Sequence, residues 1–337
     1  MNLVQPAAAT TIDSPAIGGR FSVVIVNYNG GAMLLDCVSS ALREGVPASQ
    51  IVVVDNGSHD DSLHLLEAHL PGARILRNAC NAGFARAVNQ GINQGIAQTS
   101  SDFILLLNND ALLEQNALRA FADAFDTLPR LAIAGGQLRY PDGRLQNAFA
   151  PLPTLTEELL PLPLIRLFAP AHARRKTLQT EPIAAESVFG ACLCVRSAVL
   201  PKLGLLDEDY FFFFEEIEWC QRAWQTGFEV YHLPGARAVH RGGHTANRFR
   251  GGARVEYQRS KLTFFRKTRS RTSYLVLSIF LIFRTFINAL SGLGMCCATL
   301  FLNRRLRLKA RTYWFVFLWL ILGRPASWGL PEKCKAS

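Results

Sequence analysis

The stretch Phe103-Ile-Leu-Leu-Leu-Asn-Asn-Asp110 joins five apolar residues to three polar ones. A short apolar run bounded by polar residues predicts a strand buried on both faces, as in the middle of a parallel sheet. In open α/β sheets, ligands bind just beyond the carboxyl ends of the strands. Asn108, Asn109 and Asp110 are therefore candidates to bind a ligand or a metal ion. The alternative is a turn that these side chains stabilise by hydrogen bonds.

Three more apolar runs precede this strand, with helical spacing between them. They are Phe21–Val26, Ile51–Val54 and Ala73–Arg77. The alternation of strand and helix predicts a mostly parallel, doubly wound α/β sheet whose strands end in polar residues at one crevice. The sequence has no G-x-G-x-x-G after the first strand and no G-x-x-x-x-G-K-[ST], which argues against a dinucleotide-binding dehydrogenase and a phosphate-loop ATPase.

The second half of the sequence places acids beside aromatic residues, in Asp207-Glu-Asp-Tyr-Phe-Phe-Phe-Phe-Glu-Glu-Ile-Glu218. This segment leads into a predicted helix. The helix dipole favours acids at a helix N-terminus, so capping is one explanation of Glu215, Glu216 and Glu218. We favour catalysis, because aromatic walls raise the pKa of a carboxylate toward the range of a general base.

Further strands are predicted around this helix: Gly190–Val195 before it, and two short ones, Phe228–His232 and Arg237–His240, after it. A histidine at a strand end, such as His240, is more often structural than a ligand. The segment 151–181 is apolar and broken by prolines, which predicts an irregular excursion that contacts acceptor or membrane, or a surface loop.

Charge is distributed unevenly along the 337 residues. Residues 1–240 contain 17 Lys and Arg against 24 Asp and Glu, whereas residues 241–311 contain 16 basic residues and one acid. Apolar runs alternate with the basic clusters, which favours anionic lipid over nucleic acid as a partner.

The eight cysteines include no C-x-x-C pair, which gives little support for a disulfide or metal centre. The first twenty residues lack the features of a signal peptide, so we expect a cytoplasmic chain with a flexible leader.

Several of these motifs occur in an order typical of one family. They are Val24-Ile-Val-Asn-Tyr-Asn-Gly30, Val52-Val-Val-Asp-Asn-Gly-Ser58, 81–91 (NAGFARAVNQG), Leu106-Leu-Asn-Asn-Asp110, Gly190-Ala-Cys192, the acidic and aromatic segment 207–218, and His240. The set resembles family 2 glycosyltransferases, which use nucleotide-diphospho-sugars and have the GT-A fold. It is most similar to the bacterial rhamnosyltransferase-like branch.

The resemblance implies a donor site and a metal site. Side chains after the first, second and fourth strands and the turn after the third would bind the nucleotide-diphospho-sugar: Asn27, Tyr28, Asp55, Gly83, Phe84, Arg86 and Asn109. Asp110 matches the last acid of the family's metal-binding D-x-D motif, and His240 matches a histidine that completes the metal or diphosphate site in some relatives. Asn108 stands where the family often has the first Asp, and an amide oxygen is a weaker ligand for Mg²⁺ or Mn²⁺ than a carboxylate.

The resemblance also implies a reaction. Glu216 stands where the family's catalytic base usually stands, with Glu215 and Glu218 supporting it or binding the acceptor. The reaction would be an inverting single displacement from dTDP-rhamnose, or from a UDP-hexose, to a glycan or a polyprenyl-diphosphate-linked acceptor in surface polysaccharide synthesis. A non-catalytic module that binds a nucleotide sugar or glycan is the alternative from another class.

The C-terminal part predicts a membrane-associated tail. We divide the chain into a leader (1–20), a GT-A domain (21–260) and a basic, apolar helical tail (261–337). The 28 residues Leu275–Leu302 are apolar except for Arg284 and Asn288, and as one helix they would measure ~42 Å. Glycines at 292 and 294 also allow a break, giving two interfacial helices or a re-entrant hairpin. Basic residues at 304–311 favour the cytoplasmic face of a membrane, and buried helices of a soluble dimer are the alternative.

Overall fold

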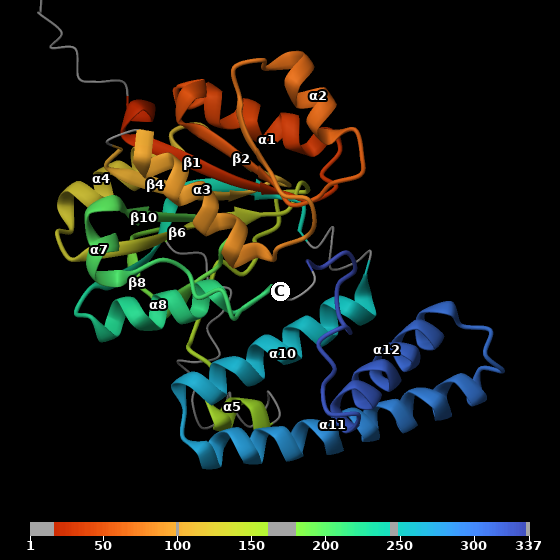
Figure 1. The fold of residues 1–337 in the computed structure, drawn as a ribbon. Coiled ribbons are helices and arrows are strands. Elements are labelled where there is room, and N and C mark those ends of the chain that lie inside the picture. The colour runs from red at the N-terminus through yellow and green to blue at the C-terminus, as the bar shows by residue number, and fades with distance from the viewer. Residues whose placement is uncertain (1–16, 99–100, 161–179, 243–248, 335–337) are drawn as a thin grey trace, which may run out of the picture.

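The computed structural model describes residues 17–98, 101–160, 180–242 and 249–334. Most of the predicted leader (1–16) and most of the predicted excursion (161–179) lie outside the described residues. The described chain forms an α/β domain and, below it in Figure 1, three long helices formed by the C-terminal part.

One mixed sheet of nine strands forms the centre of the α/β domain, in the order β3-β2-β1-β4-β10-β6-β11-β5, with β8 paired to β11. Its strands are β1 (Phe21–Asn27), β2 (Ile51–Asp55), β3 (Arg74–Arg77), β4 (Phe103–Asn108), β5 (Ala111–Leu113), β6 (Leu131–Arg139), β8 (Ile183–Ala184), β10 (Cys192–Arg196) and β11 (Glu229–His240). β7 (Phe149–Ala150) and β9 (Ser187–Val188) form a separate small sheet. The first four strands are parallel, as predicted, and β10 joins β4 antiparallel.

Helices cover both faces of this sheet (Figure 1). They are α1 (Ala32–Arg43), α2 (Ser62–His69), α3 (Phe84–Gln98), α4 (Ala117–Thr127), α7 (Leu200–Leu203) and α8 (Glu215–Gln225), with short 3₁₀ turns η1 (Ile17–Arg20), η2 (Ala48–Gln50) and η4 (Ser197–Val199). α5 (Leu155–Leu159) instead lies beside α11.

Strand β4 lies between β1 and β10 and contributes side chains to the apolar cores on both faces of the sheet. Phe103, Leu105 and Leu107 pack with residues of α1 and α4, whereas Ile104 and Leu106 pack with residues of α3 and α8. The prediction of a strand buried on both faces is therefore confirmed. This burial fixes the strand, so that residues 108–110 emerge at one defined point of the sheet edge.

The prediction of two short strands at 228–232 and 237–240 is wrong, because β11 is one strand that pairs with β6 from Glu229 to Leu233 and again from Arg237 to Val239. The register shifts between Leu233 and Arg237, where a β-bulge takes up the extra residues. Pairing resumes after the bulge. The continuous strand carries His240 to the same sheet edge as Asp110.

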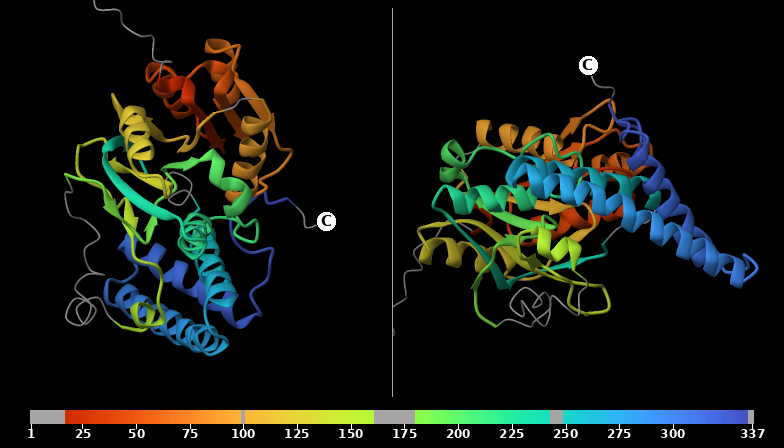
Figure 2. Two further views of the ribbon diagram at one scale, coloured as in Figure 1. Left: turned by 90° about the vertical axis from the view of Figure 1, so that its left-hand side faces the viewer. Right: turned by 90° about the horizontal axis from the view of Figure 1, so that it is seen from below.

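The C-terminal helices are α10 (Arg250–Thr268), α11 (Arg271–Ala298) and α12 (Arg304–Ile321). α10 lies between the α/β domain and the α11–α12 hairpin, as Figure 1 and the left view of Figure 2 show. The predicted division at residue 260 falls within α10. The helix does not break at Gly292 or Gly294; instead Gly292 lets α12 approach closely, since a Cβ at this position would lie 3.1 Å from Ala310.

Within the described part of the chain, α11 is the one helix long and apolar enough to cross a membrane by length and composition. About a third of its most apolar segment is buried inside the protein. Large apolar side chains remain exposed along one side of it, among them Ile279, Phe283, Ile287 and Leu290.

Candidate active site

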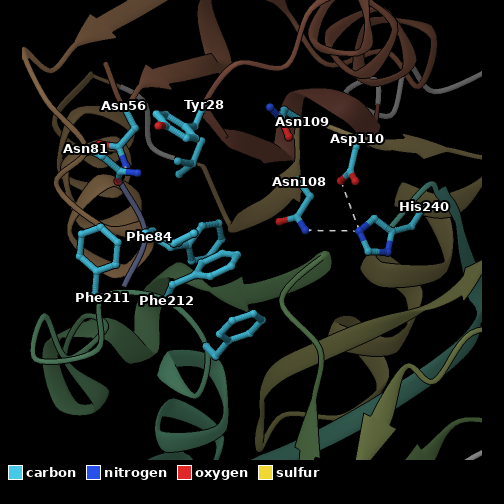
Figure 3. A pocket seen from close by; sticks show the side chains of 13 residues that line it. Tyr28, Asn56, Asn81, Phe84, Asn108, Asn109, Asp110, Phe211, Phe212 and His240 are labelled. Atoms are coloured by element: carbon cyan, nitrogen blue, oxygen red, sulfur yellow. Dashed lines mark hydrogen bonds and ion pairs between the residues drawn. The ribbon is translucent and has the colours of Figure 1, made fainter. Parts of the chain in front are cut away.

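A pocket of about 220 Å³ lies beyond the carboxyl ends of β1, β2 and β4 (Figure 3). Strand ends, the turn before α3, the aromatic segment before α8 and the C-terminal segment all contribute to it. Its lining residues are Val26, Tyr28, Asn56, Asn81, Phe84, Asn108, Asn109, Asp110, Phe211, Phe212, Phe213, His240 and Leu330. Aromatic rings and neutral amides dominate one end, and Asp110 with His240 forms the other.

Asp110 and His240 face each other across the pocket edge. His240 Nε2 lies 3.3 Å from Asp110 Oδ1 and 3.5 Å from Asn108 Nδ2. Gln146, which the sequence did not single out, fixes the imidazole: its amide nitrogen donates to the backbone oxygens of His240 and Arg139, so its Oε1 accepts from His240 Nδ1 at 2.9 Å. In the neutral imidazole, Nε2 then presents its lone pair to the Asp110 carboxylate.

Asp110 Oδ1 and His240 Nε2 both donate electron pairs, so their close approach suits a cation or a proton held between them. Burial would raise the pKa of Asp110, but the hydrogen bond and charge of a protonated His240, with backbone N–H groups, outweigh burial and lower it. The carboxylate is therefore ionised at neutral pH. Carboxylate oxygen and imidazole nitrogen are both ligands for Mn²⁺, and Mg²⁺ prefers oxygen ligands such as the carboxylate. Asn108 faces His240 with its Nδ2, so its amide would have to turn over to offer an oxygen to a cation here. The described residues contain no cluster of three or more His, Cys, Asp or Glu side chains, so a bound ion would need further ligands from substrate or water.

Asn27 and Asp55 lie beneath the pocket rather than in its wall. Asn27 is fully buried, and its amide donates to Asp55 Oδ1 at 3.0 Å and to the hydroxyls of Ser58 and Ser62. Its Oδ1 accepts from Asn109 Nδ2 at 2.9 Å. This network orients Asn109, which lines the pocket, whereas Asn27 and Asp55 are not among the lining residues.

The turn before α3 brings Gly83 and Phe84 to the aromatic segment. Gly83 has a φ of +92°, and a Cβ there would lie 2.8 Å from the Phe211 ring, so only glycine fits. The Phe84 N–H donates to the Phe211 carbonyl oxygen at 2.7 Å. Arg86, by contrast, is not among the pocket-lining residues: it is exposed, with Nε 3.8 Å from Glu208 Oε2.

The three predicted catalytic acids differ in their surroundings. Glu218 forms an ion pair with Arg222 at 2.7 Å, and Arg222 donates in turn to the Leu203 carbonyl oxygen, so Glu218 is engaged in holding α8. Glu215 and Glu216 each have a buried Oε2 with no hydrogen-bond partner among the described residues. These two carboxylates remain available for chemistry.

Burial raises the pKa of Glu216 to about 7, against backbone hydrogen bonds, including one from Gly190, that lower it. Burial and the charge of Glu216 also raise the pKa of Glu215 well above its usual range. Glu216 is linked to the pocket through the start of β10, since the residue after Gly190, Ala191, accepts from the Asn108 N–H at 3.1 Å. Glu216 packs against Gly190, and neither Glu215 nor Glu216 is among the residues that line the pocket.

Two consecutive non-glycine residues with positive φ precede these acids. Phe213 and Phe214 have φ values of 71° and 73°, a conformation that costs free energy for large side chains. The turn directs Phe213 into the pocket and buries Phe214 against α10. Asn56, Asn81 and the aromatic residues 211–213 belong to the motifs named above, but local sequence did not assign them to the pocket wall.

The C-terminal segment also borders the pocket, which the sequence did not predict. Leu330 lines it, and Glu332 Oε2 accepts from the Tyr28 hydroxyl at 2.6 Å. A disulfide joins Cys80 to Cys334, so the expectation that the cysteines form no disulfide is wrong. The two residues are 254 positions apart, and only the folding of the chain brings them together.

The family model described as "Glycosyl transferase family 2" matches residues 22–192, about half of the chain. The chain therefore belongs to glycosyl transferase family 2 and is a glycosyltransferase, which confirms the predicted family.

Curated relatives agree with this assignment. The chain is 27% identical over 239 residues to an N-acetylglucosaminyl-diphospho-decaprenol L-rhamnosyltransferase of Mycobacterium tuberculosis, which covers 67% of this chain and 77% of that protein. It is 24% identical over 282 residues to a low-salt glycan biosynthesis hexosyltransferase of Haloferax volcanii, covering 77% and 80%. Among solved structures, a mannosyltransferase of Pyrobaculum calidifontis in complex with GDP-Man and Mn²⁺ is 14% identical, with a TM-score of 0.49 over 90% of this chain and 86% of its own.

The disulfide generates a test of the C-terminal segment. We expect Cys334→Ser to lower the free energy of unfolding by about 2–4 kcal/mol, because the bridge closes a very long loop of the unfolded chain. Reducing the wild type should lower its melting temperature equally. Cys297→Ser, at an exposed free cysteine, is the matched control and should leave the melting temperature unchanged. Equal melting temperatures for Cys334→Ser and wild type would contradict the bridge.

Proposed function

We propose that this enzyme transfers rhamnose from dTDP-rhamnose, with inversion, to a polyprenyl-diphosphate-linked glycan at the cytoplasmic face of the plasma membrane, in bacterial surface polysaccharide synthesis. The observation that carries the proposal is the similarity, over two thirds of the chain, to a rhamnosyltransferase whose name specifies a diphospho-decaprenol acceptor. The exposed apolar side of α11 supports contact with a membrane surface.

The pocket suits the nucleotide part of such a donor. The rings of Tyr28 and Phe84 offer apolar faces to a pyrimidine, and the Nδ2 group of Asn81 offers a donor to its edge. Asn56 holds Asn81 in place, since its own amide donates to Asn81 Oδ1 and the Gly83 carbonyl oxygen. Asn109 lies nearer the Asp110 and His240 end, where the diphosphate would lie. In this proposal Asn27 and Asp55 position that wall, and Arg86 does not contact the donor.

Glu216 is the proposed general base. The acceptor hydroxyl oxygen attacks the anomeric carbon and its proton passes to the Glu216 carboxylate. The bond from that carbon to the diphosphate oxygen breaks on the opposite side, and the electron pair leaves with the nucleoside diphosphate. Asp110 and His240, with Asn108, would hold a divalent cation, which when bound neutralises charge on the leaving diphosphate.

Replacing the base tests this assignment. We expect Glu216→Gln to lower kcat by ~10²–10⁴-fold, because the amide does not accept the proton, while the Kd for dTDP stays within about twofold of wild type. Glu218→Gln on the same helical turn is the control: loss of its pair with Arg222 should lower the melting temperature and leave kcat nearly intact. Rates should be measured with a panel of dTDP- and UDP-sugars. Wild-type turnover by Glu216→Gln would remove the residue from the mechanism.

The pH dependence follows from the raised pKa of Glu216. Its base form predominates only above about 7, so kcat/KM should rise with pH and reach a plateau above that value. The free energy of unfolding depends on pH in the opposite direction to the rate. Because folding raises the pKa of Glu216, the protonated group stabilises the folded state fully below its unfolded-state pKa. This stabilisation is lost as the pH rises through about 7. A pH–rate profile and melting temperatures in the same buffers measure both. A rate independent of pH between 5 and 9 would contradict the assignment.

The cation site predicts metal dependence and a role for Gln146. Chelation should abolish transfer, and Mg²⁺ or Mn²⁺ should restore it. Gln146→Leu should weaken Mn²⁺ binding in the presence of dTDP by ~10–100-fold, because the imidazole loses the partner that fixes its orientation. Gln50→Leu, near the opposite edge of the sheet, is the control and should bind Mn²⁺ as wild type does. Full activity in chelator would show that Asp110 and His240 share a proton instead.

A further inference from the structure

A second cavity, of about 310 Å³, lies between α10, α11 and α12. Its lining is cationic and polar, with basic side chains from two helices. The residues that matter here are Arg254, Tyr257, Gln258, Lys261, Arg284 and Asn288. We call it the cationic cavity. A wider hollow adjoins it, shares Arg254 and Tyr313, and adds further basic residues of α10 and α12.

The cationic cavity carries more positive charge than its own acid neutralises. Glu158 of α5 pairs with Lys261 at 2.6 Å and lies 3.7 Å from Arg284. Arg254 forms no ion pair with any residue in the described ranges; it lies over the Tyr257 ring at 5.3 Å. Three cations against one carboxylate leave two positive charges without a counterion. Burial lowers the pKa of Lys261; Glu158 opposes this effect, and Arg284 and Arg254 add to it.

A buried amide in the same wall also lacks a partner. Gln258 is 2% exposed, and its Oε1 has no hydrogen-bond partner among the described residues. A buried amide oxygen without a partner costs free energy, and an amide can turn to offer its NH₂ group to a ligand oxygen. Together with Asn288, it gives the cavity neutral donors beside the three cations.

The cationic cavity lies between the catalytic carboxylates and the exposed apolar face. Tyr257 packs against Phe213 and Phe214, with ring centroids 5.6 and 5.4 Å apart, and the next residue along the chain is Glu215. On the other side, Arg284 lies on α11 directly after Phe283, which is 61% exposed. A ligand held here would have one end toward the proposed base and the other toward apolar surface.

We propose that the cationic cavity binds the diphosphate of the polyprenyl-diphosphate-linked acceptor. A diphosphate esterified at both ends carries two negative charges, equal to the two unneutralised positive charges of the cavity. Its sugar would extend past Tyr257 to Glu216, and its hydrocarbon chain would follow the apolar side of α11. The assignment rests on the proposed function for the identity of the acceptor, whereas the site itself is defined by residues of this chain.

Direct binding tests the site without any turnover. Farnesyl diphosphate is titrated into the full-length protein in detergent, with farnesol as the probe that lacks phosphate. We expect the wild type to bind farnesyl diphosphate at least tenfold more tightly than farnesol, and Arg254→Gln to weaken that binding tenfold or more, since charge-assisted hydrogen bonds are lost. Arg307→Gln removes an equal charge from α12 outside the cavity and should have no effect. Equal affinities for Arg254→Gln and wild type would overturn the proposal.

Two further experiments distinguish a diphosphate-linked acceptor from a bulk lipid headgroup as the ligand of the cavity. Vesicles containing phosphatidylglycerol should bind Arg254→Gln nearly as well as wild type. If vesicle binding falls as much as farnesyl diphosphate binding, the cavity binds bulk lipid headgroups and the acceptor assignment fails. With a farnesyl-diphosphate-linked N-acetylglucosamine acceptor, Arg254→Gln should raise KM tenfold and leave kcat unchanged. Absence of wild-type turnover with every nucleotide sugar would instead contradict the proposed function, because the binding arm does not depend on it.

Discussion

The antiparallel pairing of β5 with β11 is the constraint on which the active site depends. It sets Ala111 opposite His240, and the Arg241 N–H donates to the Asp110 carbonyl oxygen at 3.1 Å. Two segments distant in the sequence are thereby fixed side by side, with carboxylate and imidazole facing each other. Since both groups donate electron pairs, their approach is favourable only when a cation or a proton lies between them. Gln146 adds to this constraint by fixing which imidazole nitrogen faces the carboxylate.

Helix α10 connects three parts of the molecule. Its buried Glu256 accepts from the Leu330 N–H at 3.2 Å and pairs with Lys333, which holds the C-terminal segment at the pocket beyond β1, β2 and β4. Its Ser260 hydroxyl donates to the Phe212 carbonyl oxygen at 2.9 Å, which holds the strained aromatic turn before Glu215 and Glu216. Its Lys261 contributes to the cationic cavity. One helix thus relates the proposed donor pocket, the proposed base and the proposed acceptor site.

Much of the fold and part of the site could be predicted from local sequence. The apolar runs ending at Asn27, Asp55 and Asn108 are buried parallel strands, because burial on both faces leaves little choice of residue type. The order of the motifs predicted that Asp110 and Glu216 belong to the active site of a transferase. The sequence did not distinguish residues that line the pocket from those beneath it, since Asn27 and Asn109 differ only in which partners surround them.

The sequence by itself thus determined the succession of strands and helices in the first half, the family, and the residues available for chemistry, because these depend on local patterns of apolar and polar residues. Only the tertiary structure decided which of those residues meet. It placed Arg86 outside the pocket, engaged Glu218 with Arg222, and brought Leu330 and Cys334 to the donor site. The physical reason is that long-range contacts, which no local pattern encodes, set burial and hydrogen-bond partners, and these in turn set the chemistry of each side chain.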